Sequence, residues 1–236
     1  MTVDAWGWLT LPNTPGGIVA GDVNLAWVEG RTLKKRLKLR LGRQLVVGGV
    51  ARAMLFDGLA AEYRSKLGIG LSAFAGIPVE RRFANYYRGD FVVGTRLFVA
   101  PSINTEVGAS FIHMLDRGAV SRQDVGLDTR WRPLASVTLA GAAVWNIWDG
   151  RLSEFDLGPR WAPTSDFELQ LGYRRTAPEL FLPRTSIFTV FADTSRDELG
   201  GSLTWQATRA LSVFGDLHPL LINGELGLDA SLRLSV

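Results

Sequence analysis

Cysteine is absent from this 236-residue chain, and histidine occurs only twice. The lack of cysteine excludes a disulfide framework, thiol chemistry and any metal site built on thiolates. His113 and His218 lie far apart in the sequence, and neither belongs to an HExxH pattern. No GxxxxGK[ST] phosphate loop occurs either. The sequence therefore predicts no metal site and no cofactor.

A long apolar run and a strong charge bias are also missing. The uncharged stretch from Pro133 to Trp148 is shorter than the roughly 18 apolar residues that mark a membrane-spanning helix, and it contains polar residues such as Asn146. The 26 basic and 23 acidic residues nearly balance, for a formal charge of +3. Basic residues are not interleaved with aromatic ones as in single-strand binders, so we expect no nucleic-acid partner.

What the sequence does contain is glycine, aromatic residues and a period of two. From Phe167 to Arg174 apolar residues occupy every second position, and the same alternation occurs at 137–147, 199–206 and 225–234. Alternation of this kind places one apolar and one polar face on a β-strand. The segments are about ten residues long, which is the length a tilted strand needs to cross a bilayer and is longer than most soluble strands.

The alternation predicts fourteen strands in one domain, 1–236. Their expected ranges are 3–11, 20–29, 33–43, 57–65, 67–76, 90–100, 104–115, 122–132, 135–147, 151–162, 166–174, 196–207, 211–220 and 224–236. Short connections alternate with longer ones, expected at 12–20, 44–56, 77–89, 117–121 and 175–194. We therefore predict an all-β fold, a closed antiparallel up-and-down transmembrane β-barrel with short periplasmic turns and longer extracellular loops.

The sequence around the third predicted strand resembles a known family. The run Leu37–Gln44, the pair Gly48-Gly49 and the triplet Phe56-Asp57-Gly58 are similar to the early hairpin of porin-like outer-membrane barrels, including the alginate-export type. This resemblance covers about 25 residues, in a motif of low to intermediate specificity, and implies an outer-membrane pore for sugars, anions or uronate-containing polymers.

Both ends of the sequence depart from what an outer-membrane protein is expected to show. Met1 is followed by no basic and apolar secretory signal, so an exported chain would be a mature or shortened form. The final residues Leu234-Ser235-Val236 lack the terminal aromatic residue that many such barrels carry. It is therefore open whether Val236 is the natural end and whether the last predicted strand closes the barrel.

Charges on the polar faces of the strands are the candidate functional residues. Four basic residues alternate with leucines near 33–43 and are expected to form one wall of the lumen: Lys34, Arg36, Lys38 and Arg40. Lysine or arginine facing lipid at mid-bilayer costs about 2–4 kcal/mol, so the leucines are expected to face the lipid. An opposing acidic wall is expected at Asp124, Asp128, Glu154 and Asp156. Further polar lining is expected at Arg96, Glu106, Arg130, Arg160, Glu168, Arg174, Asp229 and Arg233.

Two readings of these charges stay open. Opposed walls would orient dipolar solutes and set ion selectivity in an open lumen. Alternatively, the charges pair with one another and fill a closed interior, because fourteen strands lie between the filled eight-stranded barrels and the open sixteen-stranded ones. The connections at 44–56 and 177–191 are apolar enough to fold inward as a constriction, a lid or simple packing.

The favoured function is passive diffusion of small polar or anionic solutes across the outer membrane, with the lipid bilayer as partner and a homo-oligomer as an open possibility. The alternatives are a non-conducting anchoring barrel and a soluble carbohydrate-binding protein that exposes Trp6, Trp8, Trp27 and Trp161. Ser110 near His113 is the one catalytic candidate. We do not expect an enzyme.

Overall fold

The chain forms one sheet of fourteen strands and a single short 3-10 helix, η1 (Gly49–Ala51). The computed structural model describes residues 1–10, 20–79, 90–177, 180, 195–208, 210–222 and 225–235. The strands are β1 (Thr2–Thr10), β2 (Ala20–Thr32), β3 (Leu37–Val47), β4 (Ala53–Arg64), β5 (Ile69–Pro78), β6 (Phe91–Ser102), β7 (Thr105–Asp116), β8 (Ala119–Leu134), β9 (Val137–Asn146), β10 (Arg151–Thr164), β11 (Phe167–Thr176), β12 (Arg196–Gln206), β13 (Ser212–Ile222) and β14 (Glu225–Ser235). No helix in the described part of the chain is long and apolar enough to span a bilayer.

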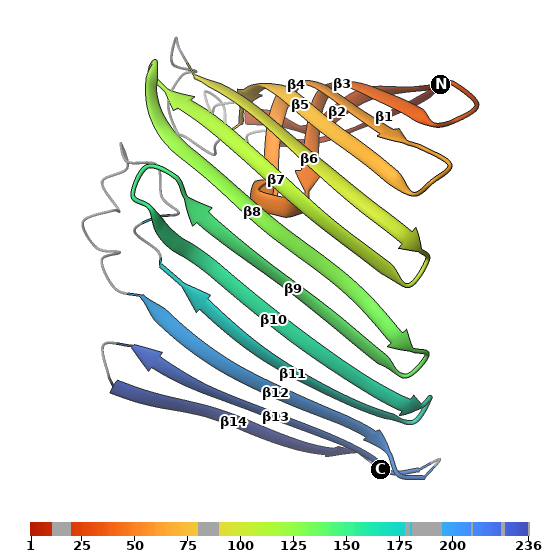
Figure 1. Ribbon diagram of the computed structural model, residues 1–236. Helices are drawn as coiled ribbons and strands as arrows, with labels where there is room; N and C mark the ends of the chain where they lie inside the picture. The colour runs from red at the N-terminus through yellow and green to blue at the C-terminus, as the bar shows by residue number, and fades with distance from the viewer. Residues whose placement is uncertain are drawn as a thin grey trace.

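The strands follow one another across the sheet in sequence order, and each is antiparallel to its neighbours (Figure 1). They are 9 to 16 residues long. Both chain ends lie at the end of the strands where the short turns are found. The prediction of an all-β, up-and-down arrangement of fourteen strands is confirmed.

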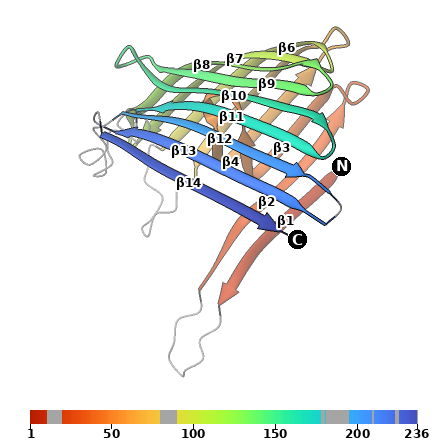
Figure 2. The ribbon, with the colours of Figure 1, turned by 90° about the horizontal axis from the view of Figure 1, so that it is seen from below.

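The sheet is strongly curved, and its two edges are β1 and β14 (Figures 1 and 2). Each edge strand pairs on one side only, with β2 and β13 respectively. Within the described residues no register joins β1 to β14. Closure of the ring therefore stays a prediction.

Two of the five connections that the sequence predicts to be long are shorter in the structure. The connection after β7 was expected to be long, at 117–121, but it contains only Arg117 and Gly118, and Asp116 already pairs with Ala119. Both turn residues have positive φ angles, 54° and 79°, which is the backbone of the two-residue hairpin turn that matches strand twist. The sequence signal here is a single glycine, which explains the error.

The other difference is in the segment between β3 and β4, which was expected to be a loop at 44–56. Most of it continues the two strands, and only Gly48 to Arg52 connect them. The ends of β3 and β4 turn into the hollow of the curved sheet and carry η1 with them (Figures 1 and 2). The expectation that this segment folds inward is confirmed, because Val50 is 2% exposed and contacts of η1 with β7 and β8 are present.

A row of glycines marks the place where the hairpin bends inward. Gly42 on β3 pairs with Gly58 on β4, which pairs with Gly76 on β5. A Cβ atom on Gly58 would overlap with the Ala75 carbonyl oxygen, and Gly42 has a φ of 121°. Only glycine permits this backbone and this close approach of strands. The row therefore forms a crease in the sheet, which we call the glycine crease.

An apolar core lies between the inward hairpin and the sheet. It contains Val50, Ala51, Phe56, Phe74, Val92, Ile112, Met114 and Val144. The rings of Phe56 and Phe74 lie 5.3 Å apart between centroids. Because fully burying a side chain of this size is worth about 1.5–3 kcal/mol, this core holds the hairpin against the sheet.

Candidate functional site

The two faces of the sheet differ in composition. We call the face that η1 packs against the inner face, and the opposite face the outer face. On the outer face, apolar side chains are exposed from β3 to β14, including Leu41 at 62%, Leu127 at 55% and Leu232 at 72%. Exposed leucine in such a continuous band indicates a surface made for lipid.

The predicted basic wall is divided between β3 and the turn before it. Lys38 and Arg40 lie on β3 and alternate with the exposed Leu39 and Leu41, so they point to the inner face, as expected. Lys34 and Arg36 do not lie on a strand, because β3 begins at Leu37 and not at residue 33. They belong to the β2–β3 turn at the end of the hollow.

Glu29 joins the basic wall to β2 and was not among the predicted site residues. Its side chain is 4% exposed and accepts hydrogen bonds from Arg31 Nε at 2.8 Å and Arg40 Nη2 at 3.0 Å. Lys38 Nζ lies 3.5 Å from the same carboxylate. The Arg40 guanidinium also stacks over the Trp27 ring, 4.2 Å from its centroid. Three cations thus share one buried carboxylate, and a surplus of positive charge remains.

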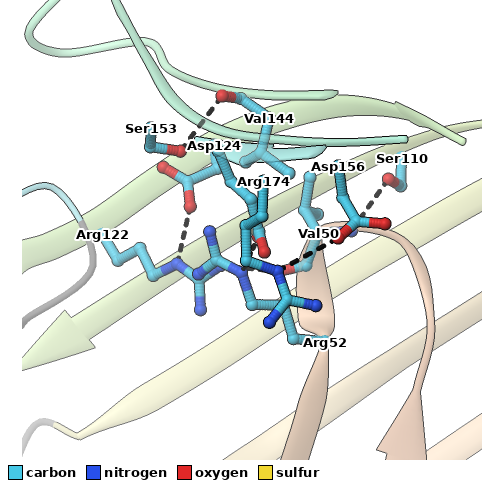
Figure 3. Close-up of polar contacts among 10 residues, drawn as sticks. Val50, Arg52, Ser110, Arg122, Asp124, Val144, Ser153, Asp156 and Arg174 are labelled. Carbon is cyan, nitrogen blue, oxygen red and sulfur yellow. Dashed lines mark hydrogen bonds and ion pairs between the residues drawn. The ribbon is translucent and has the colours of Figure 1, made fainter. Parts of the chain in front are cut away.

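The four residues of the predicted acidic wall each have an arginine partner. Asp124, which is fully buried, accepts a hydrogen bond from Arg122 Nε at 2.6 Å, and Asp128 accepts one from Arg96 Nε at 3.0 Å. The other two pairs are Glu154 with Arg52 at 2.6 Å and Asp156 with Arg174 at 3.0 Å. Figure 3 labels Asp156 and Arg174. This wall is therefore close to neutral.

The tip of the inward hairpin is fastened to three distant strands (Figure 3). The Val50 amide donates to Ser110 Oγ on β7 at 3.0 Å, and Arg122 on β8 donates to the Val50 carbonyl at 2.6 Å. Arg52 reaches Glu154 on β10, 102 residues away in the sequence. Burial, together with the charge of Arg122, lowers the pKa of Arg52, and the Glu154 carboxylate opposes this change. These contacts fix the hairpin across the hollow.

The remaining predicted lining residues all lie on the inner face. Two of them are paired with each other, since Glu168 accepts hydrogen bonds from Arg160 at 2.7 and 2.6 Å. Glu106 accepts one from Arg96 at 2.8 Å. No ion pair involves the other three within the described part of the chain: Arg130, Asp229 and Arg233.

A cavity of about 270 Å³ lies between the inward hairpin and the β3–β7 part of the sheet. Lys38 and Arg40 line it from β3, together with Gln44 and Ser110. The ring of Phe98, which lines this cavity, contacts two guanidinium groups. That of Arg64 lies 4.7 Å from the ring centroid, and that of Arg96 lies 5.0 Å from it. The cavity therefore combines cationic and aromatic surface.

Tryptophans on the outer face lie near the short-turn ends of alternate strands. Trp131 on β8, Trp161 on β10 and Trp205 on β12 are each 46–49% exposed. Near the opposite ends, Phe91 and Trp145 are exposed on the same face. From Leu139, the β9 partner of Trp131, six residues lead to Trp145, or about 20 Å along a strand. Aromatic belts at two such levels are typical of transmembrane barrels.

Sequence comparison finds neither a family model nor a curated protein that matches the chain. Structure comparison finds porins. The anion-selective porin from Comamonas acidovorans matches with a TM-score of 0.52 and 11% identity, over 91% of this chain and 71% of that one. Pseudomonas aeruginosa OccK10 (OpdN) gives 0.56 and 13%, over 98% and 81%, and OccD3 (OpdP) of the same organism gives 0.52 and 12%, over 92% and 78%.

The chain has the fold of an outer-membrane porin. In porins the outer face meets lipid and the inner face borders the lumen. The charges described above lie on the inner face of this fold, and their role as lumen lining stays a prediction. The porin-like fold predicted from Leu37 to Gly58 is thereby confirmed.

The other predicted sites have no place in this porin fold. Ser110 lies on the inner face against Val50, whereas His113, three residues along β7, belongs to the outer face. The two side chains therefore point in opposite directions and cannot act together. No group of three or more metal-binding side chains occurs among the described residues.

The tryptophans named for the carbohydrate-binding alternative do not form one surface either. Trp27 stacks with Arg40 on the inner face, and Trp161 belongs to the outer belt. Trp6 on β1 is 56% exposed, and the side chain of Trp8 lies outside the described residues.

The second apolar connection, at 177–191, has two described residues. Ala177 and Leu180 are buried, at 4% and 6% exposure, as expected for a segment that packs against the barrel. The rest of this connection lies outside the described residues.

Proposed function

We propose that this chain is an outer-membrane channel for the passive diffusion of small polar or anionic solutes. The observation that carries the proposal is the unequal charge of the two walls. Arg31, Lys38 and Arg40 share the single carboxylate of Glu29, whereas each residue of the acidic wall pairs with an arginine, and Asp128 shares its partner Arg96 with Glu106. A path along β2 to β4 is therefore positive, and it favours anions over cations.

The inward hairpin supports a narrow path. It covers part of the inner face and brings Lys38 and Arg40 to the wall of the 270 Å³ cavity. A solute that passes there exchanges part of its hydration shell for the guanidinium and ammonium donors. One structural neighbour is an anion-selective porin, which agrees with this direction of selectivity.

Single-channel recording tests the proposal. The refolded chain is added to a planar bilayer between KCl solutions of unequal concentration. It is expected to show discrete openings, with a reversal potential shifted towards the equilibrium potential of chloride. Lys38→Gln and Arg40→Gln are each expected to shift the reversal potential towards the equilibrium potential of potassium. The double variant is expected to shift it further. Lys66→Gln, on the exposed β4–β5 turn, is the control and is expected to change little. Cation selectivity in the unchanged protein would refute the proposal.

A second candidate is a non-conducting anchoring barrel, which the fastening of η1 favours. The hairpin tip is held by an apolar core and by Arg52–Glu154 across the hollow. If this plug is complete, the folded protein inserts but stays silent. Replacing Gly48–Arg52 with a short Gly-Ser connection is then expected to produce openings, whereas a channel that is already open would only increase its conductance.

A further inference from the structure

A second cavity, which we call the basic hollow, lies at the short-turn end of the basic wall. Its volume is about 220 Å³, and its lining contains five cations and one carboxylate: Arg31, Lys35, Arg36, Lys38, Arg64 and Glu62. Lys38, Glu62 and Arg64 also line the larger cavity. The hollow therefore lies at the mouth of the path described above.

The charges of this hollow are far from balanced. Glu62 already accepts a hydrogen bond from Arg64 Nε at 2.7 Å. Glu29, beside the hollow, is shared by Arg31, Lys38 and Arg40. Within the described residues no ion pair involves Lys35 or Arg36. Cations held close together without enough carboxylates need anions from solution.

The turn that carries Lys35 and Arg36 has an unfavourable backbone. Leu33, Lys34 and Lys35 have φ angles of 51°, 55° and 67°, so three successive residues other than glycine are left-handed. This backbone is unfavourable for a residue with a side chain, because Cβ comes close to the following carbonyl oxygen. Two backbone hydrogen bonds hold the turn: Arg36 N to Leu33 O at 3.2 Å, and Arg64 N to Arg36 O at 3.0 Å. Residues in such strained conformations cluster at active sites, ligand clamps and switch regions.

We propose that this hollow is a binding site for a multivalent oxyanion of the phosphate class. Three guanidinium groups offer paired N–H donors that match phosphoryl oxygens, and two ammonium groups add point charges. A multivalent anion satisfies several of these donors at once, which chloride cannot do. The inference rests on the proposed function and deepens it, because it uses the same basic wall. It names the class of solute that binds at the entrance of the path along this wall.

Calorimetric titration of the refolded full-length chain with inorganic pyrophosphate, in chloride buffer, tests the site. Saturable binding is expected. Lys35→Gln combined with Arg36→Gln is expected to weaken it at least about tenfold, since two charge-assisted contacts are lost. Lys34→Gln removes the same type of charge from the same turn but does not line the hollow, so it is expected to change the affinity little. Absence of saturable binding, or an equal loss in Lys34→Gln and Lys35→Gln, would overturn the inference.

Two further arms separate the possible explanations. Titration reports binding whether or not the protein conducts, so a silent protein that binds pyrophosphate refutes the channel but keeps the site. A conducting protein without saturable pyrophosphate binding refutes the site but keeps the channel. In nanodiscs with phosphatidylglycerol, weaker pyrophosphate binding than in phosphatidylcholine nanodiscs identifies a lipid headgroup as the occupant of the same site. Equal binding identifies a soluble anion.

Discussion

Glu29 decides the charge of the basic wall at the scale of single residues. It is almost completely buried, and its carboxylate lies within 3.5 Å of cationic groups of Arg31, Lys38 and Arg40. One negative charge cannot neutralise three positive ones, yet it holds their side chains in place. Removal of this charge therefore separates two effects, the order of the wall and its net charge.

Glu29→Gln is expected to increase selectivity for anions. A unit charge about 7 Å from a passing ion is worth about 0.6 kcal/mol at the dielectric constant of water, which is close to threefold in ion occupancy. Because loss of the charge favours chloride and disfavours potassium by the same amount, the permeability ratio of chloride to potassium, taken from the reversal potential, is expected to rise by about the square of this factor, roughly sevenfold.

The matched control for this change is Glu168→Gln. It removes the same charge from the inner face of β11, where Arg160 is the partner. A smaller shift in this variant places the ion path near β2 to β4. Equal shifts would show that the path does not follow the basic wall.

The glycine crease decides the shape of the interior at the scale of elements. Gly42, Gly58 and Gly76 are aligned across three strands, and beyond them β3 and β4 turn inward. Arg43 and Asp57, each next to a glycine of the crease, form an ion pair on the outer face of the sheet with two hydrogen bonds of 2.8 Å. The crease thus determines both the position of η1 and the size of the cavity behind it.

Gly58→Ala is expected to destabilise the fold by roughly 1–3 kcal/mol, as insertion of a methyl group into a filled site does. Its Cβ atom would meet the backbone of Ala75 and Gly76, which cannot move aside without separating β4 from β5. Urea unfolding in detergent micelles measures the change.

Gly172→Ala on β11 is the control for the crease, because a Cβ atom there has nothing within 4 Å. The same exchange in open space is expected to be neutral or slightly stabilising. If both variants unfold at the same urea concentration, the crease does not require glycine.

The number of strands, and the face of the sheet on which each side chain lies, could be predicted because both depend on local sequence. Alternation such as Leu39-Arg40-Leu41 fixes which side chain faces inward in any register. The crease could not be predicted, since the three glycines become neighbours only through strand pairing. Lys34 and Arg36 were placed on a strand because the alternation continues through the turn, and left-handed lysines carry no sequence signal. Glu29 needed the β2–β3 register, which sets it opposite Arg40.

The aromatic belts define how the whole molecule would lie in a bilayer. Trp131, Trp161 and Trp205 on the outer face are expected to contact lipid headgroups, whereas Trp27 lies on the inner face with Arg40. In vesicles with lipids brominated near the headgroup, replacement of each belt tryptophan by phenylalanine is expected to reduce the quenchable fluorescence. Trp27→Phe is expected to leave it unchanged. An equal reduction in all four variants would contradict this orientation.

Closure of the barrel is the last property of the whole molecule, and it can be tested because the chain has no cysteine. An edge strand in lipid leaves backbone groups without partners, so β1 and β14 need a partner there. They run antiparallel, and a register that sets Val3 against Leu234 on the outer face sets Asp4 against Arg233 on the inner one. With both Val3→Cys and Leu234→Cys, mild oxidation is expected to join the two edges within one chain. Disulfide-linked dimers would show instead that a second copy covers each edge.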